Sequence, residues 1–398
     1  MDKLYYTLFI FVYIFILVFN IESLSISIYE IELLQDSHLN GFWIRLISLF
    51  DIKYSFLLLH IVNLYLMYRL SLLVLNTKKE AFYSLILFAL LPSVSLLGVI
   101  VNMSSIVIFI TLLFLITFIN RYFIIALYIL FCSLFVDNSF FYLYISLFIY
   151  GISRKNYAFI YISLAFIMSS IGIYDIDIGG RPRGYFLTSF GMFLAIFSPF
   201  VFLYFCYSLY RVSLTTSKNI IWHISFYTFV IALLLSFRQK IDIEDFGVFL
   251  VIFIPIMVKV FFHSFNSHIK ELRFKYKLIG QGILISAILS FLITFLNKPL
   301  FLLLENPNNH FAYKYYIVKE LSTKLKQNNI YEVSSSNKSL QKRLGFYEIK
   351  KGKNILYENK PTSIKDSQYL KTIDIKYLEK KVKTYYVILP KINKRKIL

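Results

Sequence analysis

The chain has 398 residues, of which 58% are hydrophobic, 19% aromatic and only 16% charged, whereas soluble domains carry about 25% charged residues. This composition excludes a soluble globular protein, a disordered chain and a fibrous repeat, and the long apolar runs predict a polytopic helical membrane protein. The net charge at pH 7 is +20. Residues 298–398 hold 22 Lys and Arg against 8 Asp and Glu, a net charge of +14, so the basic balance belongs mostly to this tail and gives no reason to expect nucleic acid as a partner.

Apolar runs between residues 4 and 297 predict an all-α membrane domain over residues 1–297 with about eleven transmembrane helices. Their ranges are 4–22, 53–75, 80–98, 101–119, 122–136, 139–152, 157–173, 185–210, 219–237, 246–263 and 278–297. The first run follows Lys3 and lacks a small-residue cleavage site after it, which favours a retained anchor over a signal peptide. The runs at 122–136 and 139–152 are short for a bilayer, so we expect these helices to be tilted, merged or partly buried.

The Lys and Arg residues of the loops predict the orientation of these helices. With the N-terminus inside, the inner loops contain twelve Lys and Arg and three acids, whereas the outer loops contain five Lys and Arg and eleven acids. Eleven crossings then place the C-terminal tail outside. The frequent Ile, Phe, Tyr, Lys and Asn are typical of an AT-rich bacterial genome, so we expect a multi-pass protein of the bacterial inner membrane with a cytoplasmic N-terminus and a periplasmic or extracellular tail.

The first outer loop, residues 22–53, carries the first candidate site. Apolar residues recur at helical spacing from Leu39 onward, with Ser37 as a plausible N-cap, and predict an amphipathic helix on the outer membrane surface with Trp43 at headgroup level. Three acids precede this helix, close to where the first span leaves the lipid: Glu30, Glu32 and Asp36. Either they form a catalytic site at the interface, or they are a solvated acidic loop that obeys the topology rule.

Two later outer loops combine arginines with acids. The loop at 174–185 contains Arg181 and Arg183 beside glycines that let the backbone approach a ligand, and the loop at 238–247 contains Arg238 and Lys240. Arginine binds phosphate oxygens bidentately, so these four cations are candidate phosphate ligands. The alternative is that they contact lipid headgroups or pair with the acids of their own loops.

The sequence gives little indication of a metal site or of a disulfide bond. The only cysteines, Cys132 and Cys206, fall inside apolar runs, which leaves neither a disulfide framework nor a thiolate metal site. The six histidines are scattered over spans and both sides of the membrane, so we expect them to be structural. The outer carboxylates suit a divalent cation, but their spacing specifies none, and no cofactor is required.

The tail, residues 298–398, predicts a small α/β domain. Apolar residues recur at helical spacing between Phe311 and Leu325, and short runs at 330–333, 354–357 and 385–389 resemble strands. The net charge of +14 favours anionic headgroups, lipid phosphates or acidic glycans as partners, or is simply a solvated basic surface.

The order of these features resembles the GT-C superfamily of membrane glycosyltransferases, especially the protein-mannosyltransferase-like family 39 and its lipid A aminoarabinose-transferase relatives. The matching features are the acidic cluster after the first span, the surface helix of the first outer loop, Glu80-Ala81-Phe82 entering a span that ends at Leu90-Leu91-Pro92, and a soluble outer domain. Tyr29-Glu30-Ile31-Glu32 occupies the place of the family's catalytic acid, although the family often has adjacent Asp-Glu. Asn102 stands where the family has a second acid.

The resemblance implies transfer of a sugar from a polyprenyl-phosphate donor to a glycan, lipid or protein acceptor on the outer face of the membrane. One carboxylate then acts as base toward the acceptor hydroxyl, and cations stabilise the departing phosphate. Two other functions remain open. One is a transporter or flippase for a lipid-linked solute, which scarce intramembrane charge and the absence of evident helix breaks disfavour. The other is a catalytically inactive GT-C-like scaffold, which Asn102 keeps open.

Overall fold

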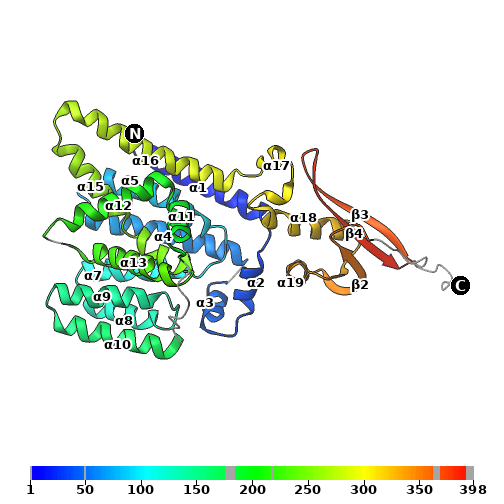
Figure 1. The fold of residues 1–398 in the computed structure, drawn as a ribbon, viewed down its shortest axis with the longest axis horizontal. Coiled ribbons are helices and arrows are strands. Elements are labelled where there is room, and N and C mark those ends of the chain that lie inside the picture. The colour runs from blue at the N-terminus through cyan, green and yellow to red at the C-terminus, as the bar shows by residue number, and fades with distance from the viewer. Residues whose placement is uncertain (1, 49–50, 175–183, 217, 362–367, 391–398) are drawn as a thin grey trace. The chain divides into compact units, whose positions relative to one another are not determined.

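The computed structural model describes residues 2–48, 51–174, 184–216, 218–361 and 368–390, and these residues form two compact units (Figure 1). The first, here called the membrane unit, comprises Met1–Leu17 and Ser37–Thr294. The second, here called the tail unit, comprises Val18–Asp36 and Phe295–Leu398. A segment from the start of the chain therefore folds with the tail.

The membrane unit is all helical in its described residues. Its helices are α1 (Asp2–Ser23, whose last turns belong to the tail unit), α3 (Leu39–Ile47), α4 (Ile52–Val74), α5 (Lys78–Leu90), α6 (Pro92–Leu96), α7 (Ser104–Ile119), α8 (Phe123–Ser133), α9 (Phe140–Ser153), α10 (Tyr157–Tyr174), α11 (Phe186–Phe197), α12 (Pro199–Ser213), α13 (Ile220–Arg238), α14 (Ile243–Val251), α15 (Ile254–Ser267) and α16 (Lys270–Phe295).

The membrane helices are fewer than the apolar runs. Among the described residues, five helices are long and apolar enough to cross a membrane, namely α1, α4, α10, α13 and α16. The count rises to seven if the bent pairs α11–α12 and α14–α15 each cross once. The expected spans at 101–119, 122–136 and 139–152 are apolar helices of 10–17 residues. The protein is therefore an integral membrane protein with five to seven candidate spans and further apolar helices.

The run at 185–210, predicted as one helix, is broken in the middle. Helices α11 and α12 meet at an angle of 106°, and Ser198 between them has a φ of 71°. Pro199, the first residue of α12, explains the break, because a proline lacks the amide hydrogen and disfavours helical backbone at the residue before it. A smaller bend of 43° separates α14 from α15, where Pro255 lies in the first turn of α15.

The tail unit is a small α/β fold around one four-stranded sheet. Its elements after α1 are α2 (Ile28–Gln35), α17 (Leu300–Leu303), the short 3₁₀-helix η1 (Pro307–Asn309), α18 (Tyr313–Gln327), β1 (Glu332–Ser335), α19 (Lys338–Phe346), β2 (Lys350–Tyr357), β3 (Gln368–Tyr377) and β4 (Lys380–Pro390). The strand order is β1-β2-β4-β3, with β1 parallel to β2 and the other pairs antiparallel. The structure thus confirms the helix and the three strand segments that the sequence predicts, and adds β3 and α19.

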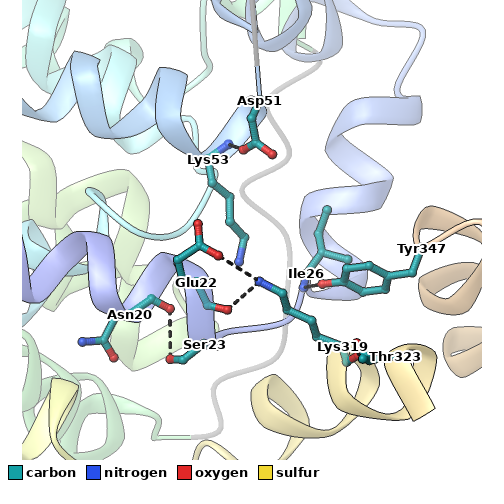
Figure 2. A network of polar contacts seen from close by, with 9 residues as sticks. All are labelled: Asn20, Glu22, Ser23, Ile26, Asp51, Lys53, Lys319, Thr323 and Tyr347. Atoms are coloured by element: carbon teal, nitrogen blue, oxygen red, sulfur yellow. Dashed lines mark hydrogen bonds and ion pairs between the residues drawn. The ribbon is translucent and has the colours of Figure 1, made fainter. Parts of the chain in front are cut away.

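The core of the tail unit explains why α2 folds with it. Apolar residues of α18, α19 and the sheet form one buried cluster, including Leu321, Leu344 and Val387. Arg343 of α19 is only 7% exposed, and its guanidinium donates from Nε to the carbonyl of Ile26 at 2.7 Å and from Nη2 to the carbonyl of Lys314 at 2.6 Å. The Tyr347 hydroxyl accepts the amide hydrogen of Ile26 at 2.9 Å (Figure 2). These bonds fix the backbone that leads into α2.

Candidate functional site

Glu30, the first acid of the predicted catalytic cluster, lies in the first turn of α2 and is 1% exposed. Its carboxylate accepts the amide hydrogen of Ser27 at 2.6 Å, while the Ser27 hydroxyl accepts the amide hydrogen of Glu30 at 3.2 Å. This reciprocal arrangement is a capping box, which satisfies two amide groups at the start of a helix. The contacts of Glu30 are therefore those of a structural carboxylate.

Glu32 and Asp36 differ from Glu30 in exposure. Glu32 is exposed on α2 and forms an ion pair with Lys342 of α19, with 3.2 Å between Oε1 and Nζ. Asp36 follows the last residue of α2 and is half-buried. The three acids therefore lie on or next to one short helix of the tail unit, where only the carboxylate of Glu32 is exposed.

The predicted phosphate ligands belong to the membrane unit. Arg238 is the last residue of α13, and Lys240 lies in the segment between α13 and α14; both side chains are exposed. Arg181 and Arg183 lie outside the described residues. The structure thus places Arg238 and Lys240 next to the start of α14, where the acids of the same loop also lie.

The helix predicted in the first outer loop is present as α3, although His38 rather than Ser37 occupies the N-cap position. Gly41 and Ile44 are buried, whereas Phe42 and Leu46 are each 53% exposed, which gives α3 an outward apolar face. The Trp43 indole donates to the carbonyl of Phe135 at 2.6 Å. This bond places α3 against the turn between α8 and α9.

A second set of acids gathers where helices of the membrane unit begin. Asp245 of α14 interacts electrostatically with Asp137, Asp242 and Glu244, and these four residues are here called the carboxylate group. They come from the turn before α9 and from the start of α14. Because like charges at short range repel, the group favours a bound proton or a cationic or hydrogen-donating ligand.

Asn102 orients one member of the carboxylate group. Its side-chain carbonyl accepts the amide hydrogen of Ser104, the first residue of α7, at 2.7 Å. Its amide nitrogen donates to Oε2 of Glu244 at 2.6 Å. The two contacts agree on the orientation of the amide, since the carbonyl faces a donor and the NH₂ faces a carboxylate. Glu244 is exposed, so a positioned carboxylate is available to a ligand.

Asp137 is the most buried member of the carboxylate group, at 8% exposure. The Ser139 amide donates to its Oδ1 at 2.9 Å. Burial raises the pKa of the Asp137 carboxyl, and the hydrogen bond from the Ser139 amide opposes this shift only in part. A carboxyl with a raised pKa next to an exposed carboxylate is a pattern common at acid–base sites.

Three histidines of the two units have hydrogen-bonding partners for their rings within the fold. His60 Nε2 lies 2.9 Å from the Tyr13 hydroxyl, His223 contacts Ser153 and Asn219, and both ring nitrogens of His310 contact backbone groups. Within the described ranges, no group of three or more His, Cys, Asp or Glu is arranged to hold a metal ion.

The contact between Asn102 and Glu244 joins residues 142 positions apart, and nothing in the sequence specifies it. What the sequence does show is that all four acids of the carboxylate group lie in loops assigned to the outer side.

No protein-family model, no curated protein and no solved structure matches the chain.

Proposed function

We propose that the protein is a membrane glycosyltransferase that moves a sugar from a polyprenyl-phosphate donor to an acceptor at the outer face of the membrane, with Glu244 as the general base. The observation that carries the proposal is the 2.6 Å hydrogen bond from Asn102 to Glu244, which orients an exposed carboxylate beside three further acids. Glu32 remains the alternative base, because its carboxylate is exposed.

The reaction needs a base, a leaving group and charge stabilisation. Glu244 accepts the proton of the acceptor hydroxyl as that oxygen bonds to the anomeric carbon of the donor sugar. The bond between the anomeric carbon and the phosphate oxygen breaks, and the electron pair leaves with the polyprenyl phosphate. Arg238 and Lys240, together with Arg181 and Arg183, are the proposed cations that stabilise this phosphate.

The resemblance to GT-C enzymes places the catalytic acid at Tyr29-Glu30-Ile31-Glu32, and its second acidic position lies beside Glu244. In that superfamily a second acid is expected where this chain has Asn102. Asn102 cannot act as a base, but its amide holds a carboxylate contributed by α14. Although Asn102 replaces the family's second acid, the carboxylate of Glu244 lies beside it. The presence of this carboxylate favours an active enzyme over an inactive scaffold.

The test uses the purified full-length protein with radiolabelled polyprenyl-phosphate hexoses and pentoses and an extract of envelope glycans as acceptor. We expect consumption of at least one labelled donor, and Glu244→Gln should reduce turnover by about 100-fold or more, the usual contribution of general-base catalysis. Glu271→Gln, a change of an exposed acid of α16, is the matched control and should keep full activity. Full activity of Glu244→Gln, with loss in Glu32→Gln, would transfer the role to Glu32.

A second candidate function, transport of a lipid-linked solute, is favoured by the break between α11 and α12. Transporters build binding sites from discontinuous helices, and the 106° angle at Ser198 is such a discontinuity. Protein-containing liposomes with a fluorescent polyprenyl-phosphate sugar separate the two functions. A transporter moves the probe between leaflets with no chemical change, whereas a glycosyltransferase converts it.

A further inference from the structure

A pocket in the tail unit has no place in the proposed reaction. It comprises about 790 Å³, including space open to solvent, and lies between the end of α1, the start of α17, α18 and the β3–β4 hairpin. Its lining includes Lys298, Phe301, Tyr316, Ile375 and Lys376. The pocket therefore combines cations with aromatic and aliphatic walls.

Among the described residues, two of the pocket's lysines form no ion pair. Lys319 pairs with Glu22 at 3.7 Å (Figure 2), and Glu320 pairs with Lys324 at 2.7 Å, so both acids of the pocket already face a lysine. Within the described residues, Lys298 and Lys376 take part in no ion pair and no side-chain hydrogen bond. Lys298 interacts electrostatically with Glu320 and Lys376 with Asp374, but each of these acids already forms an ion pair with another lysine, Lys324 or Lys381. An anion entering the pocket therefore meets two cations that are not held in an ion pair.

Lys298 is held in place and partly removed from water. Its ammonium lies 5.1 Å from the centre of the Tyr316 ring, and the Tyr316 hydroxyl donates to Oδ1 of Asn297 at 2.7 Å. Burial lowers the pKa of Lys298, which means that its charged form lacks part of its hydration. A bound anion restores the lost stabilisation of this charge.

Lys376 lines the pocket next to an irregularity in the pairing of β3 and β4. The register of the pair shifts between Ile375 and Lys376, and β4 contributes one extra residue there. In a regular strand, successive side chains point to opposite faces, yet Ile375, Lys376 and Tyr377 all line the pocket. The irregularity increases the local twist of the hairpin, and Val382, the extra residue of β4, lines the same pocket. The Lys380 ammonium also donates to the carbonyl of Leu304 at 2.5 Å, which ties the hairpin to the segment after α17.

The pocket lies where two candidate membrane helices end. Glu22 and Ser23, at the end of α1, line it, and Lys298 follows α16 by three residues. Residues at the ends of membrane-spanning helices lie at the level of lipid headgroups. The apolar side of the pocket also suits a ligand with hydrocarbon next to its charge.

We propose that this pocket binds the phosphate ester of a membrane lipid, with Lys298 and Lys376 as the two cations that contact the phosphate. The proposal goes beyond sugar transfer and does not depend on it, because it concerns binding alone. Lysine is a common phosphate ligand, acting as a point charge. The nearby aromatic and aliphatic residues contact the glycerol or the start of the chains.

The experiment measures binding to the full-length protein in an uncharged detergent. The lipid probe is dioctanoyl phosphatidic acid, the soluble probe is glycerol phosphate, and dioctanoylglycerol is the probe without phosphate. We expect the phosphatidic acid to bind more tightly than either of the other two. Lys298→Gln and Lys376→Gln should each weaken its binding about tenfold, in keeping with the loss of one charged contact. Lys351→Gln removes a positive charge from an exposed position of β2, and this variant should bind phosphatidic acid like the wild type.

Three results overturn the proposal. The first is equal affinity of wild type, Lys298→Gln and Lys376→Gln for phosphatidic acid. The second is an equal loss in Lys351→Gln, which would indicate attraction by the overall charge of the tail. The third is pocket-dependent binding of glycerol phosphate alone, which would assign the site to soluble phosphate esters. Thermal unfolding of each variant checks that the substitution leaves the fold intact.

Discussion

Replacement of Glu30 separates a structural carboxylate from a catalytic one. Glu30→Ala removes the carboxylate that accepts the Ser27 amide hydrogen in the capping box at the start of α2. Loss of such a cap costs about 0.5–2 kcal/mol. Because Glu30 is 1% exposed, water cannot easily replace its carboxylate as the acceptor, and we expect the free energy of unfolding to fall by about 2 kcal/mol. Hydrogen exchange of the α2 amides should then accelerate by more than about tenfold, since about 1.4 kcal/mol corresponds to a factor of ten.

Glu30→Gln distinguishes the two roles, because glutamine also completes a capping box but is no base. We expect α2 to exchange as in the wild type and sugar transfer to continue. Glu32→Ala is the matched control for stability, since it removes only a surface ion pair and should cost less than about 1 kcal/mol. Normal exchange in Glu30→Ala, or a loss of transfer in a stable Glu30→Gln, would refute the structural assignment.

Three further predictions concern stability and topology. Arg343→Met should destabilise the tail unit by about 3–5 kcal/mol, because two carbonyls lose a charged donor, whereas the neighbouring Lys342→Met should change stability by less than about 1 kcal/mol in the same unfolding assay. Asp137→Asn should raise the unfolding temperature at pH 7. Because the folded-state pKa of Asp137 is raised, the stability that this residue contributes at low pH is lost as the pH rises through that pKa, and this loss should be absent in the variant. An impermeant thiol reagent on intact cells, with Cys132 and Cys206 replaced by alanine, should label Ser336→Cys in the tail but not Thr216→Cys; the reverse pattern would invert the orientation.

Local patterns predicted most of the elements. The apolar period between Phe311 and Leu325 and the short runs at 330–333, 354–357 and 385–389 predicted α18, β1, β2 and β4. Helix α2 was not predicted, although Ser27-Ile28-Tyr29-Glu30 has the spacing of a capping box. Pro199 likewise carried the signal for the break in the run at 185–210, although apolar character alone predicted one helix.

Long-range contacts account for what the sequence did not predict. The hydrogen bond from Asn102 to Glu244 depends on how α7 packs near α14. The backbone at Ile26, which leads into α2, is held by Arg343 and Tyr347, more than 300 positions later. Register irregularities such as the one at Lys376 leave no mark in the alternation of polar and apolar residues. The sequence therefore assigned the charged residues to loops, but it could not predict which of their side chains contact one another.

The formation of polyprenyl phosphate from a labelled polyprenyl-phosphate sugar is the most direct test of sugar transfer with Glu244 as the base. A single-turnover assay with purified wild-type protein and excess enzyme follows cleavage of the donor independently of product release. We expect the wild type to form polyprenyl phosphate when the acceptor extract is present. Glu244→Gln should bind the donor but form polyprenyl phosphate about 100-fold more slowly. Equal rates for the wild type and Glu244→Gln would contradict the account.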